Sequence, residues 1–192
     1  MVLEIPNPSY CPDKCQEIAT FVCMTAQEKQ VLQVLEDLNI EYRHFTHPPI
    51  PTIEEGLKYW KNIDAQHCKN IFFRNHKGKR HYLVIIDYKQ NLAIHDLEQR
   101  LKQGKLTFAS EKRLKKWLGL TPGSVTPFGL INDTENHVHV FLDENLAYAE
   151  RISFHPNINT ATVDMLFGDF VKFLEWTENS FEFVRLYERK EE

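Results

Sequence analysis

The stretch Lys69-Asn70-Ile71-Phe72-Phe73-Arg74, followed by Asn75-His76-Lys77-Gly78-Lys79 and Arg80-His81-Tyr82-Leu83-Val84-Ile85-Ile86, decides the fold. Two runs rich in β-branched and aromatic residues flank a short polar linker, which is the pattern of a β-hairpin. Gly78 can adopt the positive φ angle that the turn needs. The sequence therefore predicts two central strands at 69–74 and 80–86.

Before this hairpin, the chain carries two helix-start signals. Thr25-Ala26-Gln27-Glu28 has the form of a capping box, and apolar residues at helical spacing follow it, so we expect a helix at 26–39. A short strand is expected at 41–45, ended by His47-Pro48-Pro49, because proline cannot donate to a sheet. A second capping signal at Thr52 predicts a short helix that runs to about Lys61.

After the hairpin, helical and strand patterns follow each other without the regular alternation of a Rossmann sheet. The helix at 110–118 has Ser110 as its expected N-cap and Gly119 as its C-terminal stop. Helices are expected at 96–103, 110–118 and 169–176, and strands at 138–142, 151–154, 160–165 and 181–186. The pattern predicts an α+β fold with a mixed, barrel-like β-sheet surrounded by helices.

The length and composition fit one globular domain. The chain has 192 residues, of which 42% are hydrophobic and 26% charged, and it contains no internal repeat or flexible linker. Residues 1–24 lack clear periodicity and are expected to be an N-terminal extension. The domain itself is expected at 25–186, with a tail at 187–192.

Several features concern the cellular setting. No apolar run approaches the roughly 18 residues that span a bilayer, and the first ten residues are unlike a signal peptide, so we expect a cytoplasmic protein that uses no membrane. A chain of this kind does not need disulfides, so the four cysteines, Cys11, Cys15, Cys23 and Cys68, are expected to be free thiols.

The net charge of −4 argues against a protein that grips long stretches of nucleic acid. The segment 100–116 is an exception, because it holds seven basic residues and a single acid, Glu111. This segment could contact a phosphate backbone, although a solvated helix face is the more common meaning of such a charge run.

Motifs for nucleotide or metal chemistry are weak. There is no glycine-rich phosphate loop. His137 and His139 would share one face of a strand, and Cys11 and Cys15 are four residues apart, but neither pair has partners at a recognisable ligand spacing. We therefore expect no metal and no cofactor.

Three polar segments remain, each where a strand meets a loop: His67-Cys68-Lys69-Asn70, Gly123-Ser124-Val125-Thr126-Pro127 and Phe154-His155-Pro156-Asn157-Ile158-Asn159-Thr160. A lysine at a strand mouth can anchor a phosphate or a carbonyl, and backbone amides of a tight glycine loop can point at an oxyanion. Taken singly, each segment is more often a surface residue or an ordinary turn.

The first segment, the third segment extended by Ala161-Thr162, and His47-Pro48-Pro49 before Thr52 combine with a run that continues the glycine loop, Thr126-Pro127-Phe128-Gly129-Leu130-Ile131-Asn132-Asp133. In this combination they resemble the prolyl-tRNA editing superfamily of YbaK-like and ProX-like proteins. The resemblance is greatest to the free-standing Ala-tRNA(Pro) deacylases, also called PrdX or prolyl-tRNA synthetase-associated domain proteins. It covers about 25–185. It implies a trans-editing hydrolase that releases a wrongly attached amino acid from the acceptor end of tRNA(Pro), with prolyl-tRNA synthetase as a further expected partner.

The resemblance also implies roles for individual residues. The lysine matching Lys69 is the essential residue, the glycine loop binds the scissile carbonyl, and the histidine matching His155 limits which amino acid fits. The free 2′-hydroxyl of the terminal adenosine is thought to activate water. The expected catalytic residues are Lys69, Asn70, Gly123, Ser124 and Val125, and the expected substrate-binding residues are His47, Thr52, Pro127, His155 and Asn159.

Other interpretations stay open at this point. The domain could hold a tRNA acceptor end or a synthetase without catalysis, or deacylate another small amino acid such as cysteine or serine. A metal hydrolase built on His137 and His139 is the third hypothesis.

Overall fold

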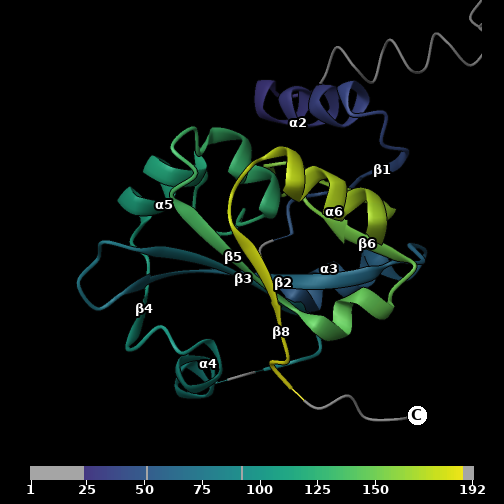
Figure 1. Ribbon diagram of the computed structural model, residues 1–192. Coiled ribbons are helices and arrows are strands. Elements are labelled where there is room, and N and C mark those ends of the chain that lie inside the picture. The colour runs from purple at the N-terminus through teal and green to yellow at the C-terminus, as the bar shows by residue number, and fades with distance from the viewer. Residues whose placement is uncertain (1–23, 51, 92, 188–192) are drawn as a thin grey trace, which may run out of the picture.

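The computed structural model describes residues 24–50, 52–91 and 93–187 (Figure 1). Except for Met24, the expected N-terminal extension, with Cys11, Cys15 and Cys23, lies outside the described residues, as does most of the expected tail. Within the described part, no helix is both long and apolar enough to cross a bilayer.

The centre of the molecule is a mixed sheet of eight strands in the order β1-β7-β6-β2-β3-β5-β8, with β4 paired to β2. Neighbours β2 and β3 are antiparallel, whereas β2 and β6, β3 and β5, and β5 and β8 are parallel. The strands are β1 (Tyr42–Thr46), β2 (Gln66–Asn75), β3 (His81–Asp87), β4 (Leu106–Phe108), β5 (Val138–Asp143), β6 (Arg151–Phe154), β7 (Ala161–Leu166) and β8 (Phe181–Val184). The α+β architecture with a mixed sheet is confirmed.

Three helices begin where their capping signals place them, whereas the helices expected at 96–103 and 169–176 begin two residues earlier, at Ile94 and Phe167. Both hydrogen bonds of the capping box at Thr25 are present, and the Thr52 hydroxyl accepts from the amide of Glu55. Ser110 is the N-cap residue of its helix but makes no side-chain capping bond, contrary to expectation. The helices are α2 (Ala26–Asp37), α3 (Ile53–Trp60), α4 (Ile94–Leu101), α5 (Glu111–Leu118) and α6 (Phe167–Trp176), with 3-10 turns η1 (Pro127–Asn132) and η2 (Glu144–Tyr148).

Strand β3 shows why the core has two sides. Its successive side chains point to opposite faces of the sheet, and all of them from His81 to Ile86 are buried. Leu83 and Ile85 pack with residues of α2, α5 and α6, whereas Val84 and Ile86 pack with residues of α4. Helices therefore cover both faces of the sheet, as Figure 1 shows.

The long strand β2 belongs to both halves of the sheet. Its first residues, Gln66 and His67, pair with β6, and its last residues, 73–75, pair with β4 on that side. Between these two pairings, residues 68–71 have a strand partner only on the β3 side within the described chain. The sheet opens here, and the residues that line the candidate site lie along this opening.

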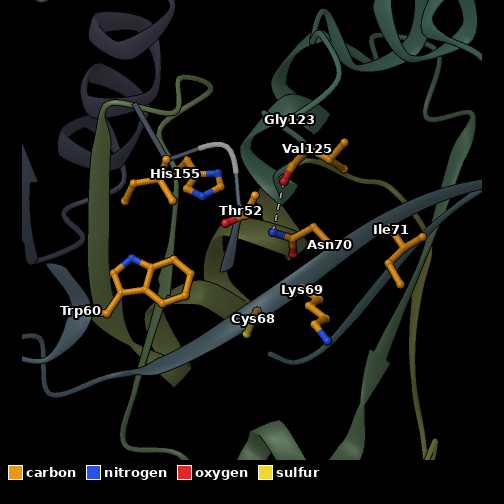
Figure 2. Close-up of a pocket in the computed structure, with 10 residues that line it drawn as sticks. Thr52, Trp60, Cys68, Lys69, Asn70, Ile71, Gly123, Val125 and His155 are labelled. Carbon is orange, nitrogen blue, oxygen red and sulfur yellow. Dashed lines mark hydrogen bonds between the residues drawn. The ribbon is translucent and has the colours of Figure 1, made fainter. Parts of the chain in front are cut away.

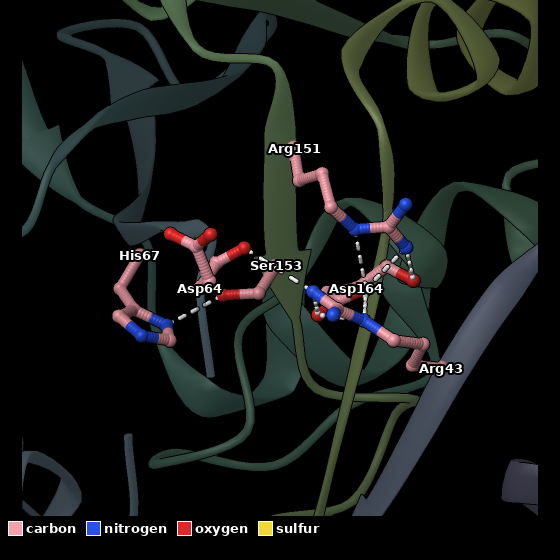
Figure 3. Close-up of polar contacts among 6 residues, drawn as sticks. All are labelled: Arg43, Asp64, His67, Arg151, Ser153 and Asp164. Carbon is pink, nitrogen blue, oxygen red and sulfur yellow. Dashed lines mark hydrogen bonds and ion pairs between the residues drawn. The ribbon is translucent and has the colours of Figure 1, made fainter. Parts of the chain in front are cut away.

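A buried carboxylate ties three strands together beside the opening (Figure 3). Asp164 on β7 is fully buried and forms ion pairs with Arg43 of β1 at 2.6 Å and with Arg151 of β6 at 2.5 Å. Burial of a charged group costs much less free energy when two hydrogen-bonded partners of opposite charge contact it than when it is unpaired. This cluster fixes the register of β1, β7 and β6.

Two details differ from the sequence-based expectation. Strand β4 was not expected, because its three residues are too few to show a pattern. His137 and His139 were expected on one strand face, but β5 begins at Val138, and the two rings have separate surroundings. His137 stacks on Trp117 with 3.6 Å between ring centroids, whereas His139 hydrogen-bonds Ser180 and Glu182.

Candidate active site

The opening beside β2 contains a cavity of about 300 Å³ (Figure 2). Its walls come from β2, from helix α3 and the segment before it, from the loop before η1, and from the turn after β6. The lining residues are Ile50, Thr52, Trp60, Cys68, Lys69, Asn70, Ile71, Gly123, Val125 and His155. All three of the polar segments singled out in the sequence therefore contribute to one cavity.

Asn70 connects β2 to the glycine loop. Its side-chain amide nitrogen donates to the carbonyl oxygen of Val125 at 3.2 Å. Only the NH₂ group can donate to a carbonyl, so this bond sets the orientation of the amide. Its oxygen Oδ1 is left buried without a partner among the described residues. A buried acceptor of this kind is satisfied when a ligand donates to it.

Lys69 lines the same cavity, but its ammonium group is engaged elsewhere. Its Nζ donates to the backbone carbonyl of Gln90 at 2.7 Å, and Figure 2 shows the side chain pointing away from His155. The charge of Lys69 also contributes to a lowered pKa of Glu54, after hydrogen bonds from the Glu54 amide and the Thr52 hydroxyl. The side chain thus lines the cavity while its ammonium group is held by the Gln90 carbonyl.

The glycine loop adopts a left-handed turn at Gly123, where φ is +86°. A side chain there would meet no atoms within 4 Å, so glycine is needed for its backbone conformation and not for space. The amide of Ser124 donates to the carbonyl of Thr121 at 3.1 Å. Gly123 and Val125 line the cavity, whereas Ser124 between them does not.

His155 faces the cavity as a neutral ring. Burial, and after it the nearby His47, lowers its pKa from 6.5 to about 4. Its Nδ1 is buried and has no partner in the described part of the chain. The Thr126 hydroxyl donates to the His155 carbonyl at 2.9 Å, which holds the turn after β6 against the glycine loop.

Four of the expected site residues do not line the cavity: Ser124, Pro127, His47 and Asn159. Pro127 is buried at the start of η1, and His47 hydrogen-bonds the Thr162 hydroxyl at 3.0 Å. The carbonyl of Asn159 accepts from the amide of Ile50, which does line the cavity.

Four lining residues were missed from the sequence: Ile50, Trp60, Cys68 and Ile71. Cys68 and Ile71 flank the two expected residues of β2, and Cys68 is a free thiol whose pKa is raised well above its ordinary range by burial. Trp60 could have been suspected as an aromatic residue at the end of a helix that begins at Thr52, but nothing local distinguishes it from a core residue.

The geometry offers no support for the metal hypothesis. Within the described residues, no group of three or more histidine, cysteine, aspartate or glutamate side chains is placed to hold a metal ion.

Comparison with known proteins identifies the family. The model of one family, the aminoacyl-tRNA editing domain, matches residues 47–173, which include every residue that lines the cavity. The chain belongs to this family.

Other members of the aminoacyl-tRNA editing family are similar over most of the chain. The prolyl-tRNA editing protein ProX of Acetoanaerobium sticklandii is 39% identical over 160 residues, which cover 83% of this chain and 97% of that protein. Prolyl-tRNA synthetase associated domain-containing protein 1 of Danio rerio is 33% identical and covers 79% of this chain and 83% of that protein.

A solved structure supports the fold. The crystal structure of a candidate trans-editing enzyme for prolyl tRNA synthetase superposes with a TM-score of 0.63 at 18% identity. The match covers 84% of this chain and 98% of that one.

Proposed function

We propose that this chain is a trans-editing aminoacyl-tRNA deacylase that hydrolyses the ester of mischarged tRNA(Pro), with Ala-tRNA(Pro) as its main substrate. The observation that carries the proposal is that six of the ten expected site residues line one cavity of about 300 Å³: Thr52, Lys69, Asn70, Gly123, Val125 and His155. A cavity of this size is at the small end for ligand sites and suits an aminoacyl group with part of a ribose.

The two ends of the aminoacyl group find complementary partners. Its α-ammonium group is a donor and a cation, and the unpartnered Oδ1 of Asn70 is a buried acceptor. The ester carbonyl requires donors, and the loop amides of Gly123 and Val125 are the candidates for them. Leaving a buried acceptor unpaired costs about 1–3 kcal/mol, so substrate binding recovers this free energy at Asn70.

The chemistry needs little from the protein beyond positioning. An aminoacyl ester is already activated, so orientation and stabilisation of the oxyanion supply much of the acceleration. Neutral His155 is held against the glycine loop and is suited to contact the amino acid rather than to carry charge. Lys69 supplies the positive charge, and we assign it to anchoring the substrate after release from Gln90, not to proton transfer.

The tRNA body is proposed to follow the basic side of the molecule. The hairpin tip at 74–80 carries four lysines and arginines and no acid, and Arg113 of α5 donates to the carbonyl of Gly78 at 2.8 Å. This contact joins the hairpin tip to the exposed lysines of α5, namely Lys112, Lys115 and Lys116. Such a surface is complementary to a phosphate backbone, and the acceptor end would then enter the cavity.

The test is release of alanine from Ala-tRNA(Pro) by the full chain and by Lys69→Ala. Removal of one oxyanion-stabilising or anchoring group typically lowers the rate about 10²- to 10³-fold, and we expect a loss in that range. Lys61→Ala, an exposed lysine just after α3, is the matched control and should keep the wild-type rate.

One outcome would revise the proposed mechanism, and another would overturn the proposed function. Equal rates for the wild type and Lys69→Ala would remove Lys69 from the mechanism. Tight binding of tRNA without release of any small amino acid, across alanyl, seryl and cysteinyl substrates, would indicate a non-catalytic module.

A further inference from the structure

One wall of the cavity is an indole ring that the sequence did not mark as functional. Trp60, the last residue of α3, is 8% exposed and lines the cavity on the side of His155, across from Asn70 (Figure 2). Its Nε1 is buried and has no hydrogen-bond partner in the described part of the chain. A large, rigid side chain in this place limits the size of the group that the cavity accepts.

A glycine one turn earlier in the same helix leaves the space that this ring occupies. Gly56 is buried, and a Cβ atom there would lie 2.7 Å from two carbon atoms of the indole. Contacts that close do not occur between real side chains, so any larger residue would push the ring aside. Gly56 has no positive φ, which means that the close approach of Trp60, and not the backbone, requires glycine.

A buried hydrogen-bonded pair packs against the indole. The ring of His67 stacks on Trp60 with 4.5 Å between centroids and 16° between planes. His67 Nδ1 is 2.6 Å from the hydroxyl oxygen of Ser153 (Figure 3). Burial lowers the pKa of His67 to about 4, against opposing effects that include the backbone carbonyls of Trp60 and Ile63, so the supporting ring is neutral.

A second, smaller space also borders the indole. A small void of about 10 Å³ is lined by Trp60 and by the supporting pair, His67 and Ser153, and it shares Cys68, Asn70 and His155 with the main cavity. Trp60 borders both spaces. Truncation of the indole would therefore extend the main cavity toward this void.

We propose that Trp60 is a specificity-determining residue, whose indole excludes aminoacyl groups larger than alanine, and that His67 and Ser153 are positioning residues for it. The inference rests on the proposed deacylase function. The cognate prolyl group carries a five-membered ring where alanine has a methyl group, and a fixed aromatic wall rejects that extra volume. Steric exclusion of a larger group is an effective form of discrimination.

The test measures kcat/KM for hydrolysis of Ala-tRNA(Pro) and of Pro-tRNA(Pro) by the wild type, Trp60→Ala, Trp60→Leu and Trp60→Phe. We expect the Ala-to-Pro ratio to fall at least about tenfold in Trp60→Ala, because even one extra or missing methylene group in an apolar pocket changes selectivity by roughly 10- to 200-fold. Trp60→Leu should shift the ratio in the same direction and serves where the alanine variant does not fold, as judged by circular dichroism.

Trp60→Phe separates the effect of the aromatic side chain's volume from the effect of the Nε1 hydrogen-bond donor. This variant keeps an aromatic ring and removes Nε1. The Ala-to-Pro ratio should therefore stay within about threefold of the wild type if side-chain volume determines the selectivity. A ratio that changes as much as in Trp60→Ala would overturn the size-exclusion inference. So would folded Trp60→Ala and Trp60→Leu proteins with the wild-type ratio. If the wild type hydrolyses neither substrate, the proposed function fails and the inference fails with it.

The positioning role has its own readout. Ser153→Ala removes the partner of His67, so the Ala-to-Pro ratio should fall by about two- to tenfold, since one hydrogen bond is worth about 0.5–1.5 kcal/mol. Ser153→Thr keeps the hydroxyl and should restore the ratio. Ser180→Ala, at an exposed serine that bonds His139, is the matched control. An unchanged ratio in Ser153→Ala would remove the pair from the specificity mechanism.

Discussion

At the scale of single residues, Asn70 shows how one side chain can belong to the scaffold and to the site at once. Its nitrogen fixes the glycine loop through Val125, and its oxygen is presented to the cavity. Only an amide side chain can do both, because it has a donor and an acceptor, whereas a carboxylate cannot donate to a carbonyl.

Asn70→Asp should therefore reduce the rate of deacylation, although aspartate has nearly the same shape as asparagine. The new oxygen would face the carbonyl of Val125 and repel it, so the loop would move and kcat/KM should fall at least about tenfold, as expected from loss of about 1–3 kcal/mol. The measurement is alanine release under saturating and limiting substrate. Asn62→Asp, at an exposed position beyond α3, is the control. Wild-type kcat/KM in Asn70→Asp would show that the loop does not depend on this hydrogen bond.

The residues of the site divide into those that a sequence can indicate and those that it cannot. Lys69, Asn70 and Gly123 lie in short polar motifs at strand ends, and that local pattern is visible in the sequence. Trp60 is different, because it looks like any apolar residue of an amphipathic helix. Only the fold shows that the indole borders a cavity, since this depends on His67 and Ser153, which are 86 positions apart.

At the scale of elements, helix α3 depends on the fit between Gly56 and Trp60. Gly56→Ala should raise intrinsic helix stability by about 1 kcal/mol, but the added methyl group collides with the indole at 2.7 Å. Overpacking usually costs about 1–3 kcal/mol, so we expect net destabilisation.

Urea denaturation of Gly56→Ala, Trp60→Ala and the double variant forms a double-mutant cycle that checks this. The collision disappears when the indole is absent, so the double variant should be more stable than the sum of the single effects predicts. Additive free energies of unfolding would contradict the packing argument.

Element prediction succeeded where the sequence carries a long or capped pattern. The β2–β3 hairpin and the helix capped by Thr25 were placed to within a few residues. Strand β4 was missed because Leu106–Phe108 is held by pairing with a distant strand and not by its own pattern. The ring of His137 was misplaced for a similar reason, since Trp117 of α5 and His81 of β3 determine its environment.

At the scale of the whole molecule, three histidines with lowered pKa values make stability depend on pH. Burial is the largest cause that lowers the pKa of His67, His81 and His155 from 6.5 to about 4. Between these two values the unfolded chain binds protons that the folded chain does not. Stability is therefore fully present above about pH 6.5 and is lost progressively as the pH falls toward about 4.

Thermal denaturation between about pH 7 and pH 5 checks this, because most carboxylates titrate below that window. The midpoint should fall steadily as the pH is lowered. His81→Gln should reduce the slope, whereas His76→Gln, on the exposed hairpin tip, should leave it unchanged. A midpoint that stays constant across the window would show that these rings take up protons without loss of the fold.

The opening of the sheet beside β2 also bears on how such a protein can diversify. The strand is held on one side by β3 along its length and on the other by β6 and β4 at its two ends. The segments that close the opening, including the glycine loop and the turn at His155, are attached to this frame without setting its register. Mutations in those segments can therefore change the amino acid that is accepted while the frame stays intact, which makes the site readily evolvable on an unchanged scaffold.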